Sequence, residues 1–529
     1  MTRRQSGQRS ISYKVIVNTL YNTFGRFWGI MVGVFLTPYI ISRIGVDRFG
    51  VWAVVGVVTG YFGLLDLGVG ASFVKYISEF YARKEYNKIS HIVNTGFTLY
   101  FILAIVSFLL VYLLKNPILA FLNMPVYLRH EAGIVLVMGI ALFGASNAMS
   151  PFLAIQGGLQ RMDISNNIGI GLSIVNIAGT VFFLEKGFGI IGLMINNVII
   201  FMILAVVNVI AARFLMPELR FRLFYIDRVI FRKILNFGYN MQIAKVSGMI
   251  ASHTDKILIT CFLSIGLVTF YQLGSSVVYY AASLAGILTS ALMPAFSEIE
   301  ARGERSRLIE AYMRSMKYIS FVIAPIFIYL AISAEQVIFI WLGYGYERSA
   351  VIIQILAGAF LINTIAQVPL SVSMAMDKPR LVAVGSLITI ISNIILSGLL
   401  IKLFGFTGAA WGTLVAVNAG TIYFMARLNA EMRIPTKNLV RVVMPYFISC
   451  AAASTVIFMV NSFIGRSFFH PGPGRIESMV LFLAKGLLFL ASYLVSVFWL
   501  KPFNADELEV IKRKIPFMSP IIARMINRP

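Results

Sequence analysis

The sequence predicts an all-α polytopic membrane protein with about 14 transmembrane helices, which form two parallel six-helix repeats and two extra C-terminal helices. Of the 529 residues, 59% are hydrophobic and only 13% are charged, whereas a soluble domain has about a quarter charged residues. Apolar runs of roughly 20 residues, long enough for a helix to cross the hydrocarbon core, recur along the whole chain. An internal repeat of about 218 residues (239 minus 21) is typical of two-lobed transporters.

The predicted spans, taken in order, define six regions of the chain. The regions are a cytoplasmic N-terminus (1–15), an N-lobe of spans 1–6 (16–212), a connector (213–236), a C-lobe of spans 7–12 (237–426), spans 13 and 14 (427–500) and a cytoplasmic tail (501–529). The spans themselves are 16–42, 48–76, 92–114, 132–157, 164–184, 187–212, 237–263, 267–296, 318–334, 349–375, 381–401, 406–426, 442–465 and 477–500.

The repeat relates the two lobes residue by residue. Six spans is an even number, so both lobes enter the membrane in the same direction, as parallel repeats do. The repeat also places a cation at the equivalent point of each lobe, Arg26 and Lys245. The matched pairs are Tyr21-Asn22 with Tyr239-Asn240, Ser78-Glu79 with Ser297-Glu298, Arg83 with Arg302, Pro151 with Pro369, and Gly187-Phe188 with Gly405-Phe406.

The positive charge of the chain, a formal net +23, is distributed as in a membrane protein. Most of the 45 Lys and Arg residues fall in the N-terminus, in the loops on that same side and in the tail. By the positive-inside rule this places both termini in the cytoplasm. We expect an amphipathic helix on the membrane surface in the basic connector. A charge spread in this way contacts lipid headgroups, so a nucleic-acid partner is not expected.

Several segments resemble a known family. Gly60 to Gly70 resembles its second-span motif, Asp255-Lys256 and Pro294 to Glu298 resemble its seventh and eighth spans, and Gly157 to Arg161 resembles the end of its fourth. Together, over about residues 12–430, the chain resembles a Wzx-type polysaccharide flippase of the MATE-like MOP exporter superfamily.

That resemblance implies a transporter of the bacterial cytoplasmic (inner) membrane. Its substrate would be a polyprenyl-diphosphate-linked oligosaccharide, carried for the synthesis of surface polysaccharide such as lipopolysaccharide or capsule. It also implies membrane lipids, a polysaccharide polymerase and assembly proteins as partners.

Cations and amides inside the spans are the candidate substrate-binding residues. A charged side chain near mid-bilayer costs several kcal/mol unless it faces a wet cavity or a partner. Arg26 lies roughly 15 Å into span 1 and Lys245 roughly 13 Å into span 7, at 1.5 Å per residue. They either line a central cavity or pair with carboxylates of their own lobe. The other candidates are Lys256 and the amides Asn18, Asn22 and Asn240.

Two acids within the spans, Asp66 and Asp255, are candidates for coupling transport to a proton or sodium gradient. The alternative for both acids is a structural role in helix packing, which for Asp66 lies in a glycine-rich segment. No motif for a metal ion or for a bound cofactor is expected.

Three further groups of charges complete the site prediction. Lys485 lies near the middle of span 14. The resemblance makes it a candidate for the phosphate end of a lipid tail, and a pairing role between spans 13 and 14 is the alternative. Glu79 and Arg83 at the end of span 2, with Glu298 and Arg302 at the end of span 8, are candidate inner gates or solvated surface charges.

The cations in the spans exceed the acids, which favours an anionic substrate such as a diphosphate. We expect no enzyme, because the chain has no nucleophile–base arrangement or phosphate-binding glycine loop. Two alternatives remain: an ion-coupled multidrug exporter of the same fold, and a membrane enzyme or scaffold of envelope glycan synthesis.

Overall fold

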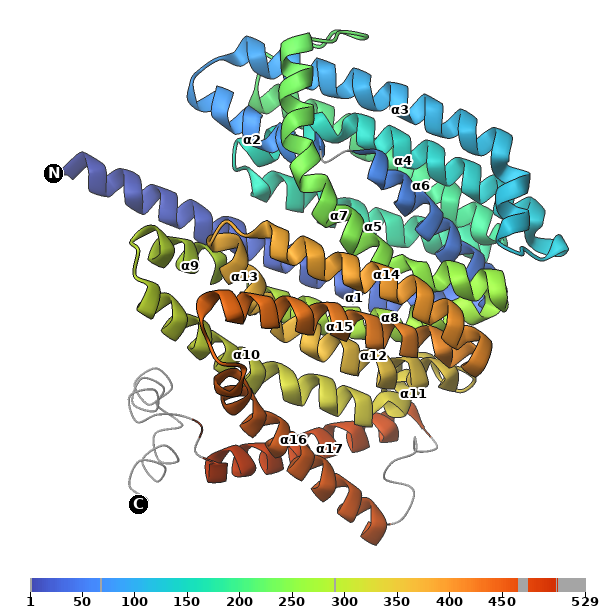
Figure 1. Ribbon diagram of the computed structural model, residues 1–529. Coiled ribbons are helices and arrows are strands. Elements are labelled where there is room, and N and C mark those ends of the chain that lie inside the picture. Colours follow the sequence, from blue (N-terminus) through green and yellow to red (C-terminus); the bar gives the residue numbers. More distant parts are fainter. Residues whose placement is uncertain (1, 67–68, 290–291, 465–473, 501, 503–529) are drawn as a thin grey trace. The chain divides into compact units, whose positions relative to one another are not determined.

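The computed structural model describes residues 2–66, 69–289, 292–464, 474–500 and 502, and all of the regular secondary structure within these residues is helical (Figure 1). Side chains are described except at 2–20, 22, 65, 71, 236–252, 284–285, 287–288 and 463–464. The helices are α1 (Thr2–Phe62), η1 (Gly63–Asp66), α2 (Val69–Ala82), α3 (Tyr86–Phe121), η2 (Val126–Leu128), α4 (Arg129–Gly158), α5 (Met162–Glu185), α6 (Gly189–Leu215), α7 (Arg228–Phe262), α8 (Ile265–Thr289), α9 (Leu292–Ala301), α10 (Arg305–Ile332), α11 (Ala334–Leu342), α12 (Glu347–Ile365), α13 (Gln367–Ala375), α14 (Pro379–Phe404), α15 (Phe406–Met432), α16 (Thr436–Ile464) and α17 (Arg475–Leu500).

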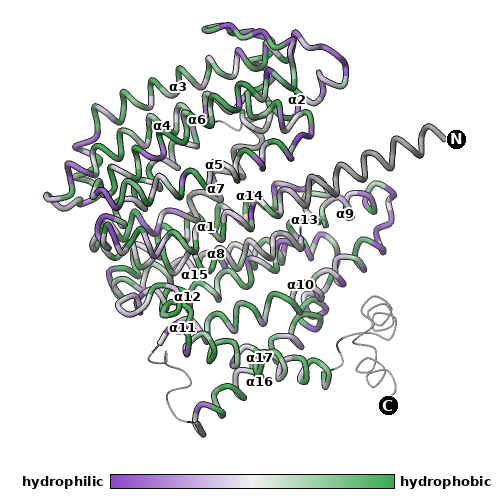
Figure 2. Tube along the Cα trace, turned by 180° about the vertical axis from the view of Figure 1, so that it is seen from behind, coloured by the Kyte–Doolittle hydropathy of each residue, from purple (hydrophilic) through white to green (hydrophobic). Residues whose placement is uncertain are grey.

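Within the described residues, eleven helical segments are long and apolar enough to cross a membrane. Figure 2 shows hydrophobic residues along the middle of the long helices and hydrophilic residues gathered at their ends and connections. A helix satisfies its own backbone hydrogen bonds, which a lipid environment requires. The predicted all-α polytopic membrane fold is therefore confirmed.

The predicted spans that are not among these eleven helical segments also correspond to helices, completely or in part. α7 and α8 lie where the seventh and eighth spans are predicted. The first span and the start of the second are merged in α1, which has a non-helical residue inside it, Gly45 (φ 80°). The rest of the second span, predicted over 48–76, is interrupted, because α1 ends at Phe62 and α2 begins only at Val69.

The chain packs as two compact units. The first comprises Met1–Gln272 with Ile401–Ala409, and the second comprises Leu273–Leu400 with Ala410–Pro529. Within the first unit, α7 contacts α1, α2 and α3. Within the second, α16 and α17 cross each other (Figure 1), and both contact α10. The lobe boundaries given by the repeat remain a prediction.

The internal repeat is visible in the helix bounds. α5 and α14 begin 217 residues apart (379 minus 162), and α6 and α15 match at both ends with the same separation (406 minus 189, 432 minus 215). Gly187 follows α5 and Gly405 follows α14, both with positive φ (79° and 59°). This left-handed conformation ends a helix and suits glycine, which has no Cβ.

A buried polar trio recurs with the repeat. In the first unit Asn196 of α6 donates to Asn176 Oδ1 (2.7 Å) and Thr180 Oγ1 (3.1 Å) of α5. In the second unit Asn393 of α14 donates to Thr413 Oγ1 of α15 (2.9 Å) and to Ser397 Oγ (3.3 Å). Each member lies 217 residues from its counterpart (393 minus 176, 397 minus 180, 413 minus 196). Such hydrogen bonds hold neighbouring helices together in an apolar environment.

The connector differs from the prediction. Residues 216–227 form an irregular loop instead of a surface helix. The reason lies in α3, whose buried polar side chains bind the connector backbone. Asn94 Nδ2 donates to the Arg220 carbonyl (2.9 Å) and Asn94 Oδ1 accepts from the Arg222 amide (3.0 Å). Ser90 and Thr95 accept from the Arg220 and Asp227 amides (3.1 and 3.0 Å). These bonds replace the intrahelical ones, so the loop is satisfied without a helix.

Candidate functional site

A polar cluster within the first unit surrounds Asp255 of α7. Asp255 and Lys256 are both buried, with 2% and 5% of their surface exposed. Tyr271 of α8 donates its hydroxyl hydrogen bond to Asp255, and Asp255 interacts electrostatically with Lys256. One residue earlier, Thr254 Oγ1 lies 3.2 Å from the Tyr61 hydroxyl of α1. An acid and a cation are thus enclosed together where α1, α7 and α8 meet.

Asp66, the other predicted coupling residue, has a similar environment at the end of η1. Tyr100 of α3 donates its hydroxyl hydrogen bond to Asp66 Oδ1, and the Gly70 amide of α2 donates to the same oxygen (3.1 Å). Asp66 therefore joins α3 to the start of α2 across the interruption of the second span. This geometry suits the packing role that the sequence leaves open, and the coupling role of Asp66 remains a prediction.

The midplane cations are described only in part. Arg26 is exposed on α1, and no ion pair is recorded for it with any side chain that the structure describes. The backbone at Lys245 and Asn240 belongs to α7, and that at Asn18 and Asn22 belongs to α1. The side chains of these four residues lie outside the described part of the chain. The pairing of Arg26 and Lys245 at one site therefore remains a prediction.

The candidate gate residues form local ion pairs at the ends of two helices. Glu79 of α2 pairs with Arg83, the residue that follows α2 (3.2 Å), and Glu298 of α9 pairs with Arg302, the residue that follows α9 (2.5 Å), both with i,i+4 spacing. Both arginines are more than half exposed. Exposed pairs of this kind contribute at most about 0.5 kcal/mol. Their equivalent places in the repeat are evident, and their role as gates remains a prediction.

A residue that the sequence analysis did not single out joins this region. Lys233, in the first turns of α7, lies 3.8 Å from Glu79 Oε1. Its ammonium group also lies over the rings of Tyr76 (4.5 Å) and Phe80 (5.0 Å) of α2. Lys233 therefore links the start of α7 to α2 by an ion pair and by cation–π contacts. Its position among the basic residues of the connector gave no signal of these contacts.

Lys485 lies on α17 and is fully buried. It interacts electrostatically with Glu335 of α11, which contacts α17 within the second unit. This environment favours the pairing role over an exposed phosphate site, with Glu335 of α11 as a charged neighbour within the described residues. The binding role of Lys485 remains a prediction.

A mixed pocket of about 310 Å³ lies between α1, α4 and α6 of the first unit. Its lining combines a tryptophan with hydroxyl and amide side chains, the groups that stack on and hydrogen-bond to polar ligands. A hydropathy profile does not single out the polar and aromatic residues of this lining, because each one lies in an apolar span. They are Trp52, Thr59, Ser146 and Asn197.

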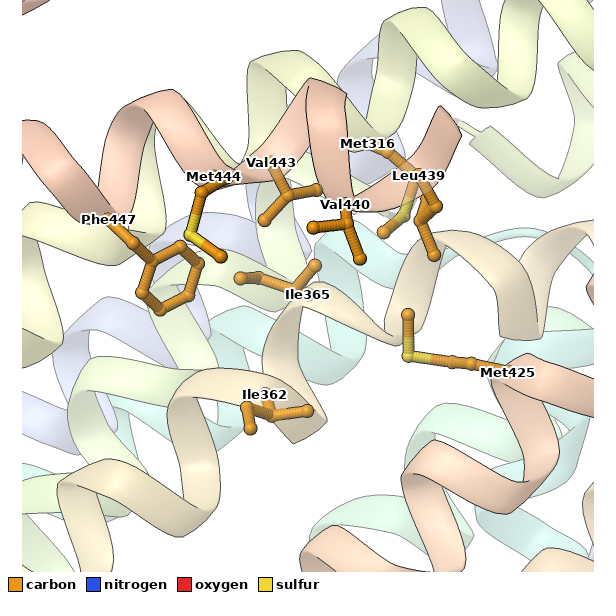
Figure 3. A pocket seen from close by; sticks show the side chains of 9 residues that line it. All are labelled: Met316, Ile362, Ile365, Met425, Leu439, Val440, Val443, Met444 and Phe447. Atoms are coloured by element: carbon orange, nitrogen blue, oxygen red, sulfur yellow. The ribbon is translucent and has the colours of Figure 1, made fainter. Parts of the chain in front are cut away.

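A second pocket of about 310 Å³ lies within the second unit, and the described residues that line it are all apolar. Figure 3 shows residues of α16 facing Ile365 of α12 and Met425 of α15 across it. Met444 and Val440 are each 46% exposed, so the pocket opens to the outside of the helix bundle. A site of this composition fits a hydrocarbon chain and offers nothing to a charged group. Its lining residues are Met316, Ile362, Ile365, Met425, Leu439, Val440, Val443, Met444 and Phe447.

Comparison with known sequences shows the family. The family model described as "Polysaccharide biosynthesis protein" matches residues 40–351. The chain is similar to a putative O-antigen transporter of Shigella flexneri, at 20% identity over 416 residues that cover 77% of this chain and 96% of the relative. It is also similar to a probable low-salt glycan biosynthesis flippase of Haloferax volcanii, at 22% identity, with 36% of this chain and 40% of the relative covered.

Comparison with solved structures shows the fold. The chain is similar to the lipid II flippase MurJ in an inward closed conformation, with a TM-score of 0.68 and 16% identity over 91% of this chain and 98% of that one. It is similar to a MATE multidrug resistance transporter of the MOP superfamily, with a TM-score of 0.64 and 14% identity over 77% of this chain and 95% of that one. The predicted resemblance, the MATE-like fold and the assignment as a multi-pass membrane transporter rather than an enzyme are confirmed.

Proposed function

The chain belongs to the polysaccharide biosynthesis protein family, and from this premise we propose that it flips polyprenyl-diphosphate-linked oligosaccharides across the cytoplasmic membrane. The observation that carries the proposal is the match to the O-antigen transporter, which spans 96% of that relative. The mechanism we propose is alternating access. The headgroup enters from the cytoplasm, the two lobes rock about the binding site, and the headgroup leaves on the other side while its lipid tail stays in the bilayer.

In this proposal the diphosphate binds to cations of both lobes. Arg26 and Lys245 occupy equivalent places in the repeat, and Arg26 is exposed without a recorded ion-pair partner among the described side chains. Arginine binds a diphosphate with two parallel hydrogen bonds, and lysine binds it as a point charge. Asn18, Asn22 and Asn240 would hydrogen-bond to the sugars or the phosphates, and Lys256 would add positive charge nearby.

Ion coupling is assigned to the two hydrogen-bonded acids, Asp255 and Asp66. A buried carboxylate beside a lysine changes the local charge when it binds a proton or a sodium ion, and such groups mark ion pathways in transporters. The neighbouring Lys256 supports Asp255 as the first residue to test. The apolar pocket of Figure 3 supports the proposal of a lipid-linked substrate, because an isoprenoid tail can lie in such a pocket during transport.

The test is translocation of a polyprenyl-diphosphate oligosaccharide by the full chain in proteoliposomes. We expect Arg26→Ala and Lys245→Ala each to reduce flipping roughly tenfold or more, because each removes a hydrogen bond or ion pair to a charged ligand. Arg43→Ala is the matched control on the helix of Arg26, because Arg43 is bound to Glu185 (2.5 Å). Flipping that survives both site variants would overturn the site assignment and leave the function intact.

The competing function is ion-coupled drug export, which the fold of the MATE transporters also supports. It predicts efflux of a cationic dye that disappears in Asp255→Asn. If the proteoliposomes export the dye and do not flip the lipid-linked sugar, the flippase proposal is wrong.

A further inference from the structure

A groove between α3 and α4 combines basic and apolar side chains in one cavity of about 590 Å³. It lies at the end of α3 that is remote from the connector, since the connector binds the beginning of α3 through Asn94. Its lining comes from the last turns of α3 and the first turns of α4. The lining residues are Tyr112, Lys115, Asn116, Leu119, Arg129, His130, Gly133, Ile134, Val137 and Met138.

The polar part of the groove is positive. Lys115 lies over the Tyr112 ring (4.8 Å), and the Arg129 guanidinium is held by a hydrogen bond from Nε to the Met124 carbonyl (3.0 Å). None of the described residues that line the groove is acidic. The nearest acid in sequence, Glu131, is engaged by Arg48 through two hydrogen bonds of 2.8 Å. The two fixed cations are therefore available to an anion, with His130 and Asn116 as additional donors.

The apolar part continues from the charged rim along α4. Ile134, Val137 and Met138 follow Arg129 by one to two and a half turns, so they line the groove from the rim inward along the helix. The surrounding surface is strongly apolar, with Leu113, Phe121 and Val126 at 74%, 71% and 80% exposure. Exposed hydrophobic side chains at the end of a membrane helix belong at the lipid interface. The groove thus offers a cationic rim and a hydrocarbon floor at the end of two helices that are long and apolar enough to cross a membrane.

We propose that this groove binds an anionic phospholipid of the leaflet opposite the connector, the outer leaflet in the predicted topology. Lys115 and Arg129 bind the headgroup phosphate, and one acyl chain lies against Ile134, Val137 and Met138. The site is separate from the substrate-binding and coupling residues, and it does not depend on the proposed function. A cation near an anionic headgroup contributes about 1 kcal/mol, which corresponds to about fivefold in affinity.

The experiment is a lipid titration of the purified full chain, read by native mass spectrometry. Phosphatidylglycerol is compared with phosphatidylcholine of the same acyl chains, which separates the anionic headgroup from the tail. We expect the wild type to prefer phosphatidylglycerol, and Lys115→Gln and Arg129→Gln each to reduce that preference about fivefold. Lys186→Gln is the matched control, because Lys186 is an exposed cation that follows α5 on the same side and lies outside the groove. It should leave the preference unchanged.

A second variant tests the apolar half. Among the described residues, a Cβ placed on Gly133 would contact the Leu119 side chain at an ordinary van der Waals distance of 3.5 Å, and we expect the larger side chain of Gly133→Leu to extend into the groove. We expect this variant to bind both lipids more weakly and to retain the wild-type unfolding temperature. The proposal is overturned if the wild type binds the two lipids equally, or if Lys186→Gln matches Lys115→Gln. It is also overturned if millimolar inorganic phosphate displaces phosphatidylglycerol, which would indicate a site for free anions.

Discussion

At the scale of single residues, the two acids in the spans share one arrangement. Asp66 accepts from the Tyr100 hydroxyl, and Asp255 accepts from the Tyr271 hydroxyl. A carboxylate that loses its water on burial needs such donors, because an unsatisfied charged group costs several kcal/mol. These two hydrogen bonds were not predicted, since aromatic residues are common in membrane spans and only the packed structure shows which tyrosine lies beside each acid.

Removal of one tyrosine hydroxyl tests this arrangement. Tyr271→Phe leaves the buried Asp255 without that donor, so we expect the free energy of unfolding to fall by about 1–3 kcal/mol. Unfolding in mixed detergent micelles measures it. Tyr280→Phe on the same helix is the control, because no hydrogen bond of its hydroxyl is recorded within the described residues. The effect of Tyr271→Phe should shrink in an Asp255→Asn background, and equal losses in both backgrounds would contradict the proposed bond.

At the scale of elements, the start of α7 is fixed by its N-cap. Asp227 accepts hydrogen bonds from the Val229 and Ile230 amides (2.9 and 3.1 Å) and lies 2.9 Å from His91 Nδ1 of α3. Burial raises the pKa of the Asp227 carboxyl, but the two amides and His91 outweigh it, so the pKa lies below its usual value. The ionised form is therefore the one that the fold stabilises.

The lowered pKa of Asp227 makes the stability of the fold depend on pH. A carboxyl with a lowered pKa in the folded state contributes stability above its ordinary pKa, and that stability disappears as the pH falls through the folded value. We expect Asp227→Ala to cost about 1 kcal/mol at pH 7, the usual value of an N-cap. The loss of unfolding free energy caused by Asp227→Ala should be smaller when unfolding is measured well below pH 4. Asp227→Asn keeps a side-chain acceptor for the N-cap and serves as the control. A loss of stability in Asp227→Ala that grows as the pH falls would contradict the role of ionised Asp227 as the N-cap.

The connector and the start of α7 also show which features could not be predicted from the sequence. The places of most helices along the chain follow from hydropathy, since a span has to be apolar over a length that the bilayer sets, whereas the merging of the first two predicted spans in α1 does not. The connector was predicted as a surface helix from its charges, yet its conformation is decided by Ser90, Asn94 and Thr95 of α3. Those side chains are buried in a predicted span, and only the packed structure shows that they bind another segment. Lys233 was missed for the same reason.

At the scale of the whole molecule, the repeat conserves geometry more than residue type. The trio Asn176, Thr180 and Asn196 has the counterparts Asn393, Ser397 and Thr413, so one amide is replaced by a hydroxyl and the helix that donates changes from α6 to α14. The matches from which the repeat was predicted are positions of identical or similar residues, and they do not include these six residues. A polar contact between helices can be kept by several residue types, which hides it from residue-by-residue comparison.

The two trios predict how stability is divided between the units. Asn196→Ala and Asn393→Ala each remove a buried donor between two helices, so we expect each to lower the free energy of unfolding by about 1 kcal/mol. Each trio lies within its own compact unit, so the losses should add within about 0.5 kcal/mol in the double variant. Asn438→Ala, at an exposed position in the first turn of α16, is the control. A double variant that loses far more or far less than the sum would show that the two trios belong to one cooperative structure, because only residues coupled through shared packing deviate from additivity.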